Sequence, residues 1–247
     1  MVVKLPSHGL ARVLSKRGLC SRREAAEWIT NGRIEVDGKA IFDPEFPIVP
    51  GRQKICVDGR PIEAVPRIYL MLNKPRGLVT TASDERDRDT VYRCLDGEGL
   101  PWVAPVGRLD KASEGLLLFC NDPQWAAGIT EPQPGLEKTY RVQIDRIPDA
   151  ALLQALVGGV EEDGERLRAV SATALRSGTK NAWLEIVLDE GRNRQIRRLL
   201  AAFDVGVLRL VRVAIGPLVL GELAKAAWRE LTPQEVEALT RQRLAGA

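Results

Sequence analysis

Histidine is nearly missing from this chain of 247 residues, which carries a single one, His8, close to one end. A serine or cysteine hydrolase that relies on histidine therefore lacks a base, and a zinc site built on imidazole is equally disfavoured. The four cysteines, Cys20, Cys56, Cys94 and Cys120, include no close pair, which argues against a disulfide framework and against a Cys-rich metal site. Any chemistry must use carboxylates, Arg, Lys, Tyr or an external cofactor.

Long apolar runs are missing too. No stretch approaches the ~18 consecutive apolar residues of a membrane helix. The N-terminal segment MVVKLPSHGLARVL lacks the continuous apolar core of a signal peptide. Hydrophobic residues make up 45% of the chain and charged residues 28%, which is typical of a globular protein with a sizeable core. We therefore expect a cytoplasmic protein with no membrane partner.

The net charge is only +3, but the charges are unevenly distributed. Residues 1–60 contain eleven Lys and Arg against seven Asp and Glu, a balance of 11 − 7 = +4, so the remainder carries 3 − 4 = −1. A basic module joined to a nearly neutral body indicates a docking unit for a polyanion.

The basic module has a readable pattern of elements. The segment LARVLSKRG (10–18) has an apolar helical face and ends in glycine. In SRREAAEWITNG (21–32), Ser21 and Glu24 form the signature of a capping box at the start of a second helix. RIEVDGKAI (33–41) predicts a hairpin with a two-residue Asp-Gly turn.

Many of the module's cations gather around the tight turn between the two predicted helices. An ordinary solvated surface is one interpretation, and contact with the phosphates of RNA or DNA is the other. Their density favours nucleic acid, because such a patch gains affinity by releasing counterions. The predicted contacts are Arg12, Lys16, Arg17, Arg22, Arg23 and Arg33.

We assign residues 1–60 to this module, 61–67 to a proline-containing linker and 68–247 to a larger domain. The larger domain is predicted to be α+β, with a mixed, mainly antiparallel sheet flanked by helices, because strands outnumber helices and mostly follow one another. The polar segment ASDERDRDTV (82–91) is expected to be a loop. Strands are expected in 68–74, 138–145, 181–190 and 205–216, and helices in 123–130, 195–203 and 232–244.

The stretch GRLDKASEGLLLFCND (107–122) places Asp110 just before a strongly apolar segment. Aspartate often serves as a turn or cap residue, so a structural role is one interpretation. At the edge of a buried strand, however, a carboxylate is partly desolvated, which raises its pKa and neutralises it unless a cation compensates. A nearby guanidinium would keep Asp110 ionised.

Candidates for that cation stand in the late segment EGRNRQIRRLL: Arg192, Arg194, Arg197 and Arg198. Arg197 directly follows Ile196, a core position of the predicted helix, and therefore lies at the boundary of the core. Its guanidinium is suited to a bidentate carboxylate pair. A helix start that faces solvent and phosphates is the alternative for these arginines.

Tyr140 lies on the apolar face of the strand KTYRVQID (138–145). A buried core tyrosine is the ordinary interpretation of such a position. The functional alternative is an aromatic platform for a nucleic acid base, because a ring face tolerates any planar partner.

These motifs, in this order, resemble the bacterial ribosomal RNA pseudouridine synthases of the RsuA type. GRLDKASEGLLLFCND is similar to the family's central motif, with Asp110 at the catalytic aspartate. YLMLNKPRG, LEKTYRV and EGRNRQIRRLL are similar to its other motifs, and LARVLSKRGLCSRREAAEWITNGRIEVDG resembles its N-terminal αL (S4-like) RNA-binding module. The resemblance extends from about Leu10 to Leu239. Histidine instead of Arg194 and methionine instead of Leu199 also occur in the family, which leaves the subgroup open.

The resemblance implies an isomerase that converts a uridine of ribosomal RNA into pseudouridine without cofactor or metal. Asp110 would act on the ribose, either as a nucleophile at the anomeric carbon or as a base that forms a glycal. Arg197 would pair with Asp110, and Tyr140 would stack on the flipped uracil. Further RNA contacts would come from Lys74, Arg108, Arg192 and Arg194.

Two other functions are compatible with parts of the sequence. A catalytically silent RNA-binding or ribosome-assembly protein would use the N-terminal module but has no need of Asp110, Tyr140 and Arg197 together. A nucleoside glycosidase usually needs two acids about 5 to 9.5 Å apart, and only Glu114 is near Asp110 in the sequence. We expect a monomer acting on ribosomal RNA, with the large subunit's RNA slightly favoured, or on a pre-ribosomal particle.

Overall fold

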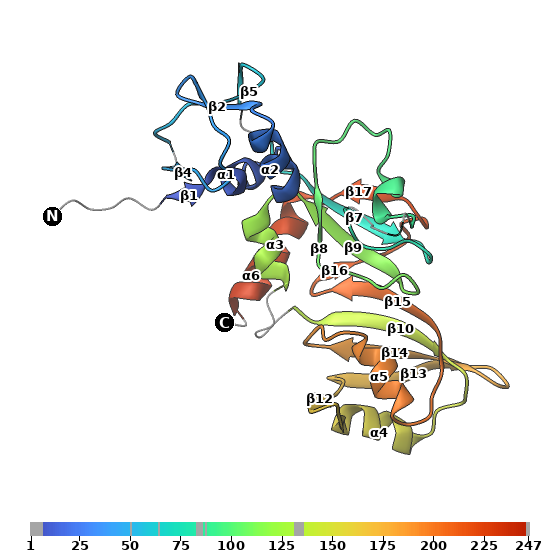
Figure 1. Ribbon diagram of the computed structural model, residues 1–247. Helices are drawn as coiled ribbons and strands as arrows, with labels where there is room; N and C mark the ends of the chain where they lie inside the picture. The colour runs from blue at the N-terminus through green and yellow to red at the C-terminus, as the bar shows by residue number, and fades with distance from the viewer. Residues whose placement is uncertain are drawn as a thin grey trace. The chain divides into compact units, whose positions relative to one another are not determined.

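The computed structural model describes residues 7–49, 51–63, 65–82, 86, 88–130 and 136–245, with side chains as far as residue 242 (Figure 1). The chain forms two compact units. One comprises Met1–Ile68, Gly97–Ala104 and Cys120–Pro123; the other comprises Tyr69–Asp96, Pro105–Phe119 and Gln124–Ala247. The domain limits 1–60, 61–67 and 68–247 stay a prediction.

The first unit contains two short helices and two small sheets. Helix α1 spans Leu10–Lys16 and α2 spans Arg22–Thr30. The four-stranded sheet has the order β3-β2-β5-β6, and the two-stranded sheet pairs β1 with β4. Their bounds are β1 His8–Gly9, β2 Ile34–Val36, β3 Lys39–Ala40, β4 Pro47–Ile48, β5 Ile55–Val57 and β6 Arg60–Pro61. Apolar side chains from both helices and three of these strands form one buried core.

Local sequence signals of this unit are confirmed. Ser21 Oγ accepts from the backbone N–H of Glu24, and the Glu24 carboxylate accepts in return from the N–H of Ser21, which completes the capping box of α2. Asp37 and Gly38 both have positive φ, 52° and 78°, as a two-residue hairpin turn requires. Pro61, the first residue of the predicted linker, pairs with Cys56 in β6–β5.

The second unit is built on a mixed sheet, in which nine strands are formed by the described residues. The order is β13-β14-β10-β15-β9-β7-β17, with β16 beside β15 and β8 beside β9. Strands β9 and β15 are parallel, whereas the pairs β10–β14, β10–β15, β13–β14 and β7–β17 are antiparallel. The bounds are β7 Tyr69–Lys74, β8 Ala104–Val106, β9 Glu114–Cys120, β10 Lys138–Ile144, β13 Ser171–Ser177, β14 Ala182–Leu188, β15 Val207–Ile215, β16 Leu218–Val219 and β17 Trp228–Glu230. The predicted α+β class is confirmed.

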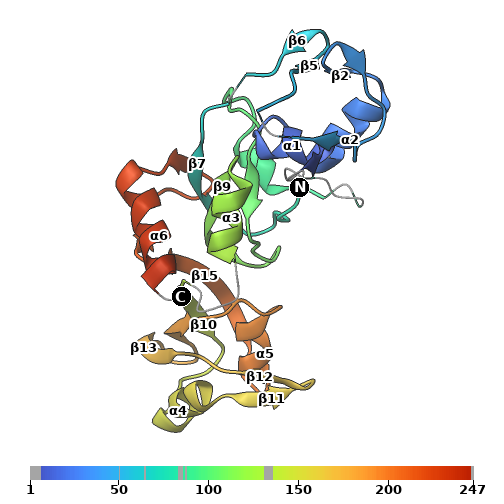
Figure 2. The same ribbon diagram turned by 90° about the vertical axis from the view of Figure 1, so that its left-hand side faces the viewer.

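Helices lie against both ends of this sheet. Figures 1 and 2 show α3 (Pro123–Thr130) beside α6 (Pro233–Ala245), and the Trp125 indole donates to Thr240 Oγ1 over 3.2 Å. At the other end, α5 (Gln195–Ala201) lies beside the hairpin β11 (Val160–Glu162) and β12 (Glu165–Leu167). Helix α4 (Ala150–Gly158) was not predicted, and α5 ends two residues before Phe203, which the sequence placed in the helix. The chain also has a short 3-10 helix at Val91–Cys94. The predicted loop 82–91 lies partly outside the described residues.

The central strands explain why the site can be rigid. All seven residues of β9 are buried, and β10 alternates as predicted, with Tyr140, Val142 and Ile144 buried on one face. At Gly115 the two parallel strands approach so closely that an added Cβ would lie 2.2 Å from the Arg212 carbonyl oxygen. Glycine is therefore required directly after the loop that carries Asp110. None of the described helices is both long and apolar enough to span a bilayer.

Candidate active site

A pocket of about 590 Å³ on the second unit brings together residues from five separate parts of the chain. They come from the loop before β9, from the end of α3, from β10, from the segment that leads into α5, and from β15. Those that bear on chemistry are Asp110, Lys138, Tyr140, Arg192, Arg194 and Arg212. Three of the predicted site residues, Asp110, Tyr140 and Arg194, thus line one pocket.

The loop that carries Asp110 is fixed from below by a buried lysine. Lys74, at the end of β7, has no exposed surface, and its ammonium donates to the carbonyl oxygens of Asp110 at 3.2 Å, Ser113 at 2.9 Å and Pro75 at 3.1 Å. Three acceptors satisfy the three N–H groups of the ammonium. The predicted role of Lys74 as an RNA contact is wrong, because a phosphate cannot reach a fully buried ammonium that is already saturated.

Burial also changes the ionisation of Lys74. Desolvation lowers its pKa to about 8, although the charges of Glu114 and Asp110 act in the opposite direction. At neutral pH the side chain still carries its charge. The sequence misled here because a lysine next to proline at a strand end is usually exposed, and its burial depends on carbonyls 36 and 39 residues away.

The other carbonyl oxygens of this loop are also hydrogen-bonded. Thr80 Oγ1 donates to Leu109 O over 2.7 Å, the backbone N–H of Gly77 donates to Lys111 O over 2.8 Å, and Arg197 Nη2 donates to Ala112 O over 3.3 Å. Every carbonyl from Leu109 to Ser113 thus has a donor from outside the loop. Such a loop holds its one carboxylate in a fixed direction, which is what catalysis by positioning requires.

Asp110 itself points toward Arg194. Its carboxylate lies 3.8 Å from the Arg194 guanidinium, and the two side chains are 38% and 52% exposed. Arg194 is the N-cap of α5 and has a left-handed backbone, φ 48° and ψ 31°, which is uncommon for a residue with a Cβ. Backbone strain of this kind often accompanies functional positions, and here it directs the guanidinium toward the pocket.

The predicted ion pair between Arg197 and Asp110 is not formed. Among the described residues, the cation within 4.0 Å of the Asp110 carboxylate is Arg194. Arg197 instead donates to the carbonyl oxygens of Val207 and Ala112, both at 3.3 Å. Burial and the charge of Arg194 lower the pKa of Arg197, while Asp110 opposes them. Arg197 therefore affects Asp110 in two ways: its hydrogen bond to Ala112 O holds the loop, and its positive charge interacts with the carboxylate.

Tyr140 forms part of the pocket wall. It is 9% exposed and lies between Ile186 of β14 and Arg212 of β15 in the sheet. The two interpretations from the sequence are compatible, because its ring belongs to the core and also borders the pocket. A planar base entering the pocket would meet an aromatic surface.

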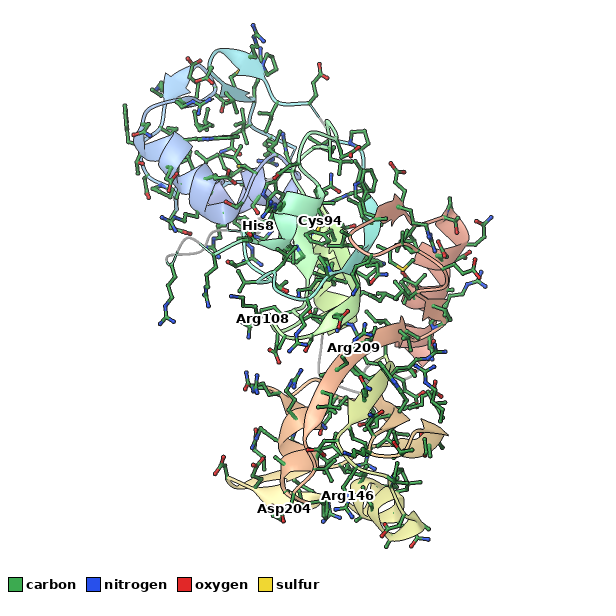
Figure 3. All side chains as sticks on the ribbon, turned by 90° about the vertical axis from the view of Figure 1, so that its right-hand side faces the viewer. His8, Cys94, Arg108, Arg146, Asp204 and Arg209 are labelled. Atoms are coloured by element: carbon green, nitrogen blue, oxygen red, sulfur yellow. The ribbon has the colours of Figure 1, made fainter. Side chains whose placement is uncertain are left out.

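The rim of the pocket carries further arginines. Arg108 is exposed on the loop before Asp110, as Figure 3 labels it. Arg192 is bound to Glu190 at 2.9 Å, and the same carboxylate accepts from the Gln195 amide at 2.6 Å. Gln195, which the sequence analysis did not single out, is buried and holds this turn together.

Glu114 cannot supply a second catalytic acid. Its carboxylate is 4% exposed and lies 3.0 Å from Arg209 and 2.8 Å from Lys225. Burial disfavours its charge, but hydrogen bonds from these two cations outweigh that effect and lower its pKa. A carboxylate held ionised by two partners does not donate a proton, which argues against the two-acid glycosidase. Figure 3 labels Arg209, on β15.

In the first unit, the predicted RNA contacts fall into two groups. Arg22, Arg23 and Arg33 form ion pairs with Glu45, Glu27 and Asp58. Arg12, Lys16 and Arg17 form no ion pair with any residue that the structure describes, and the first two are exposed. The second group is the better candidate for phosphate contacts, because its charges are not already compensated.

Comparison with known proteins agrees with this geometry. The family model for RNA pseudouridylate synthases matches residues 68–202, and that for the S4 domain matches residues 9–54. The chain belongs to the RNA pseudouridylate synthase family. It is an isomerase of the RsuA kind, with an N-terminal S4 domain, as the motifs indicated.

Relatives and solved structures resemble the chain over nearly its whole length. An RNA pseudouridine synthase of Rickettsia prowazekii is 36% identical over 92% of this chain and 96% of its own. The ribosomal large subunit pseudouridine synthase B of Bacillus subtilis is 34% identical over 93% of this chain and 94% of its own. A crystal structure of a pseudouridylate synthase superposes with a TM-score of 0.65 at 29% identity, covering 94% of this chain and all of that one.

Proposed function

We propose that this enzyme isomerises a uridine of ribosomal RNA to pseudouridine, with Asp110 as its catalytic carboxylate and without a cofactor. The observation that carries the proposal is the Asp110 loop, whose five carbonyl oxygens are all held by donors from outside it. This loop presents one carboxylate to a pocket bordered by an aromatic ring. The reaction rearranges the substrate onto itself, so one well-positioned carboxylate is sufficient.

Asp110 would act on the ribose of a nucleotide flipped out of the RNA. It either attacks the anomeric carbon or removes the neighbouring ribose proton, and both routes end with uracil released from the sugar and rejoined through carbon 5. Arg194 pairs with the carboxylate, Arg197 holds the loop, and Tyr140 stacks on the base. Unstacking that base costs a few kcal/mol, which RNA contacts of the exposed arginines offset.

The target we favour is RNA of the large ribosomal subunit, either free or in a pre-ribosomal particle. The similarity to the large-subunit synthase of Bacillus subtilis supports this choice. An enzyme of this kind works in the cytoplasm, and we propose that it is a monomer. The alternative is a catalytically silent RNA-binding protein, which would need the S4 domain but not the organised Asp110 loop.

Tritium release tests the proposal. Transcripts of both ribosomal RNAs, labelled with tritium at carbon 5 of uracil, are incubated with the protein, and the modified position is mapped. Release from the large-subunit transcript alone is expected. Tight, salt-sensitive binding without release, from transcripts and from pre-ribosomal particles alike, would identify the silent RNA-binding protein instead.

A further inference from the structure

Two cations on the floor of the pocket have no part in the mechanism described so far. Lys138 begins β10 two residues before Tyr140, so both side chains are on the same face of the sheet. Arg212 is the partner of Tyr140 across the β10–β15 pair. Both residues line the same pocket as Asp110. The two positive charges are therefore both neighbours of the residue expected to stack on the base, one along its strand and one on the next strand.

Neither charge is fully compensated within the protein. Lys138 is half-buried, and its ammonium forms no hydrogen bond or ion pair with any described residue. Arg212 is 6% exposed; its Nε donates to Leu116 O over 2.8 Å, while its Nη2 is buried without a partner among the described residues. Burying polar groups without partners is costly, and proteins keep such arrangements mainly where a ligand completes them.

The ionisation of Lys138 is consistent with this incomplete site. Burial lowers its pKa, the positive charge of Arg212 lowers it further, and only Asp189 opposes them. Asp189 is itself engaged, 3.1 Å from Arg168. The carboxylate that opposes the shift of the Lys138 pKa is thus shared with another cation.

The depth of these residues distinguishes them from the arginines at the rim. Arg108 and Arg194 are exposed and suit phosphates, which remain partly hydrated in a complex. Lys138 and Arg212 lie beside the ring that would carry the base. The group that reaches them is therefore the base and its carbonyl oxygens, not the sugar–phosphate backbone.

We propose that Lys138 binds a carbonyl oxygen of the target uracil and stabilises the negative charge that the base acquires when it leaves the ribose, with Arg212 adding a second positive charge. The inference rests on the proposed function. When the bond between C1′ of ribose and N1 of uracil breaks, both electrons stay on uracil, and the charge spreads over N1 and the two carbonyl oxygens. Carbon 5 then bonds to C1′, loses its proton, and N1 takes one up, so no external reactant is needed.

A leaving-group substitution tests this role. The target uridine is replaced by 5-fluorouridine, whose electron-withdrawing fluorine stabilises the departing base and reduces its need for a cation. Single-turnover rates of consumption of the target nucleoside, uridine or 5-fluorouridine, are measured for wild type, Lys138→Met and Lys138→Arg, with nucleosides quantified by chromatography after nuclease digestion. Consumption is the readout because carbon 5 of 5-fluorouridine has no proton to lose after it bonds to C1′, so its rearranged product is not pseudouridine. Lys138→Met is expected to slow uridine turnover about 100-fold, the scale of losing one charge-stabilising donor. With 5-fluorouridine the loss should shrink to about 10-fold, since less charge needs external stabilisation.

The controls separate the possible roles. Lys138→Arg, which keeps the charge, should remain within a few-fold of wild type, and Lys180→Met, which removes an exposed lysine outside the pocket, should have no effect. Equal losses with both bases, or a higher RNA concentration at half-saturation with an unchanged maximal rate, would overturn the inference. A wild type that converts no uridine in any ribosomal RNA would instead overturn the proposed function.

Discussion

The cations of the S4 domain and the lysine beneath the Asp110 loop are the same residue types in opposite settings. In the S4 domain, Arg12 and Lys16 are exposed and form no ion pair with described residues. In the catalytic unit, Lys74 has no exposed surface and donates three hydrogen bonds to carbonyl oxygens. The exposed cations are suited to bind a polyanion such as RNA, whereas the buried ammonium fixes the backbone around one carboxylate.

This difference shows that burial decides what a positive charge does. An exposed guanidinium costs little to keep in water and gains affinity for RNA through counterion release. A buried ammonium costs free energy unless carbonyls surround it, and it then contributes geometry. Binding and catalysis should therefore be separable by mutation.

Among the residues that support the Asp110 loop, the largest expected effect is that of Lys74→Met. Without the ammonium, the carbonyls of Asp110 and Ser113 lose their common donor, and a shift of the carboxylate by about 1 Å costs on the order of 100-fold in rate. Single-turnover rates measure the loss, and calorimetry checks that the variant folds. Lys111→Met removes an exposed lysine of the same loop and should change the rate much less. Equal losses for both would show that Lys74 acts through its charge alone.

Substitutions of the two arginines near Asp110, Arg197 and Arg194, should also reduce the rate by different amounts. Arg197→Gln removes the donor to Ala112, and losing a charged hydrogen bond of this kind should slow turnover roughly 30-fold. Arg194→Gln removes a partner that is 52% exposed, and such pairs contribute little, so we expect about a 5-fold loss. Single-turnover rates at saturating enzyme give both numbers. The reverse order would mean that the ion pair outweighs the support of the loop.

A smaller and different effect is expected in the S4 domain. Replacing Arg12, Lys16 and Arg17 together by Gln should weaken RNA binding and make the log–log salt dependence shallower by about 2. The maximal rate should not change. The matched control replaces Arg22, Arg23 and Arg33, whose charges are already paired, and should have the weaker effect. Equal slopes of the log–log salt dependence for the two triple variants would contradict the distinction between cations with and without an ion-pair partner among the described residues.

The last prediction concerns the free energy of unfolding at alkaline pH rather than activity. The pKa of Lys74 is about 8 in the folded protein, below the 10.5 of a free lysine. Its burial penalty is complete below pH 8 and is relieved as pH rises toward 10.5, because the folded state then binds fewer protons than the unfolded state. Over this pH range, the free energy of unfolding of the wild type should rise by on the order of 2 kcal/mol relative to that of Lys74→Met. Denaturant titrations of both proteins at pH 7.5 and 10 measure this change. An equal change in the free energy of unfolding of the two proteins would contradict the lowered pKa of Lys74.

Short-range signals in the sequence predicted much of the fold. The capping box of Ser21 and Glu24, the Asp37–Gly38 turn and the alternation of β10 each depend on residues close together in the chain, and all three are confirmed. Helix α4 was missed although Asp149 caps it through the N–H of Leu152 at 2.8 Å. An N-cap followed by leucines was the available signal.

Long-range contacts were the harder part of the site. Lys74 was mistaken for an RNA contact, and Arg197 for the partner of Asp110, because their hydrogen bonds run to backbone carbonyls that carry no sequence signature. The burial of Arg212 could be inferred only from the apolar residues beside it in its strand. Motifs therefore identified part of the pocket, including Asp110, Tyr140 and Arg194, but not Lys138 and Arg212. The direction of each side chain required the fold.

The most direct test of the account compares wild type with Asp110→Asn, which changes the charge of the carboxylate and nearly nothing of its shape. Tritium release from carbon 5 of uracil and RNA affinity are measured on the same ribosomal RNA. The account predicts no release by Asp110→Asn and an affinity close to that of wild type. Continued release by the variant, or a large loss of affinity together with activity, would contradict the assignment of Asp110 as the catalytic carboxylate.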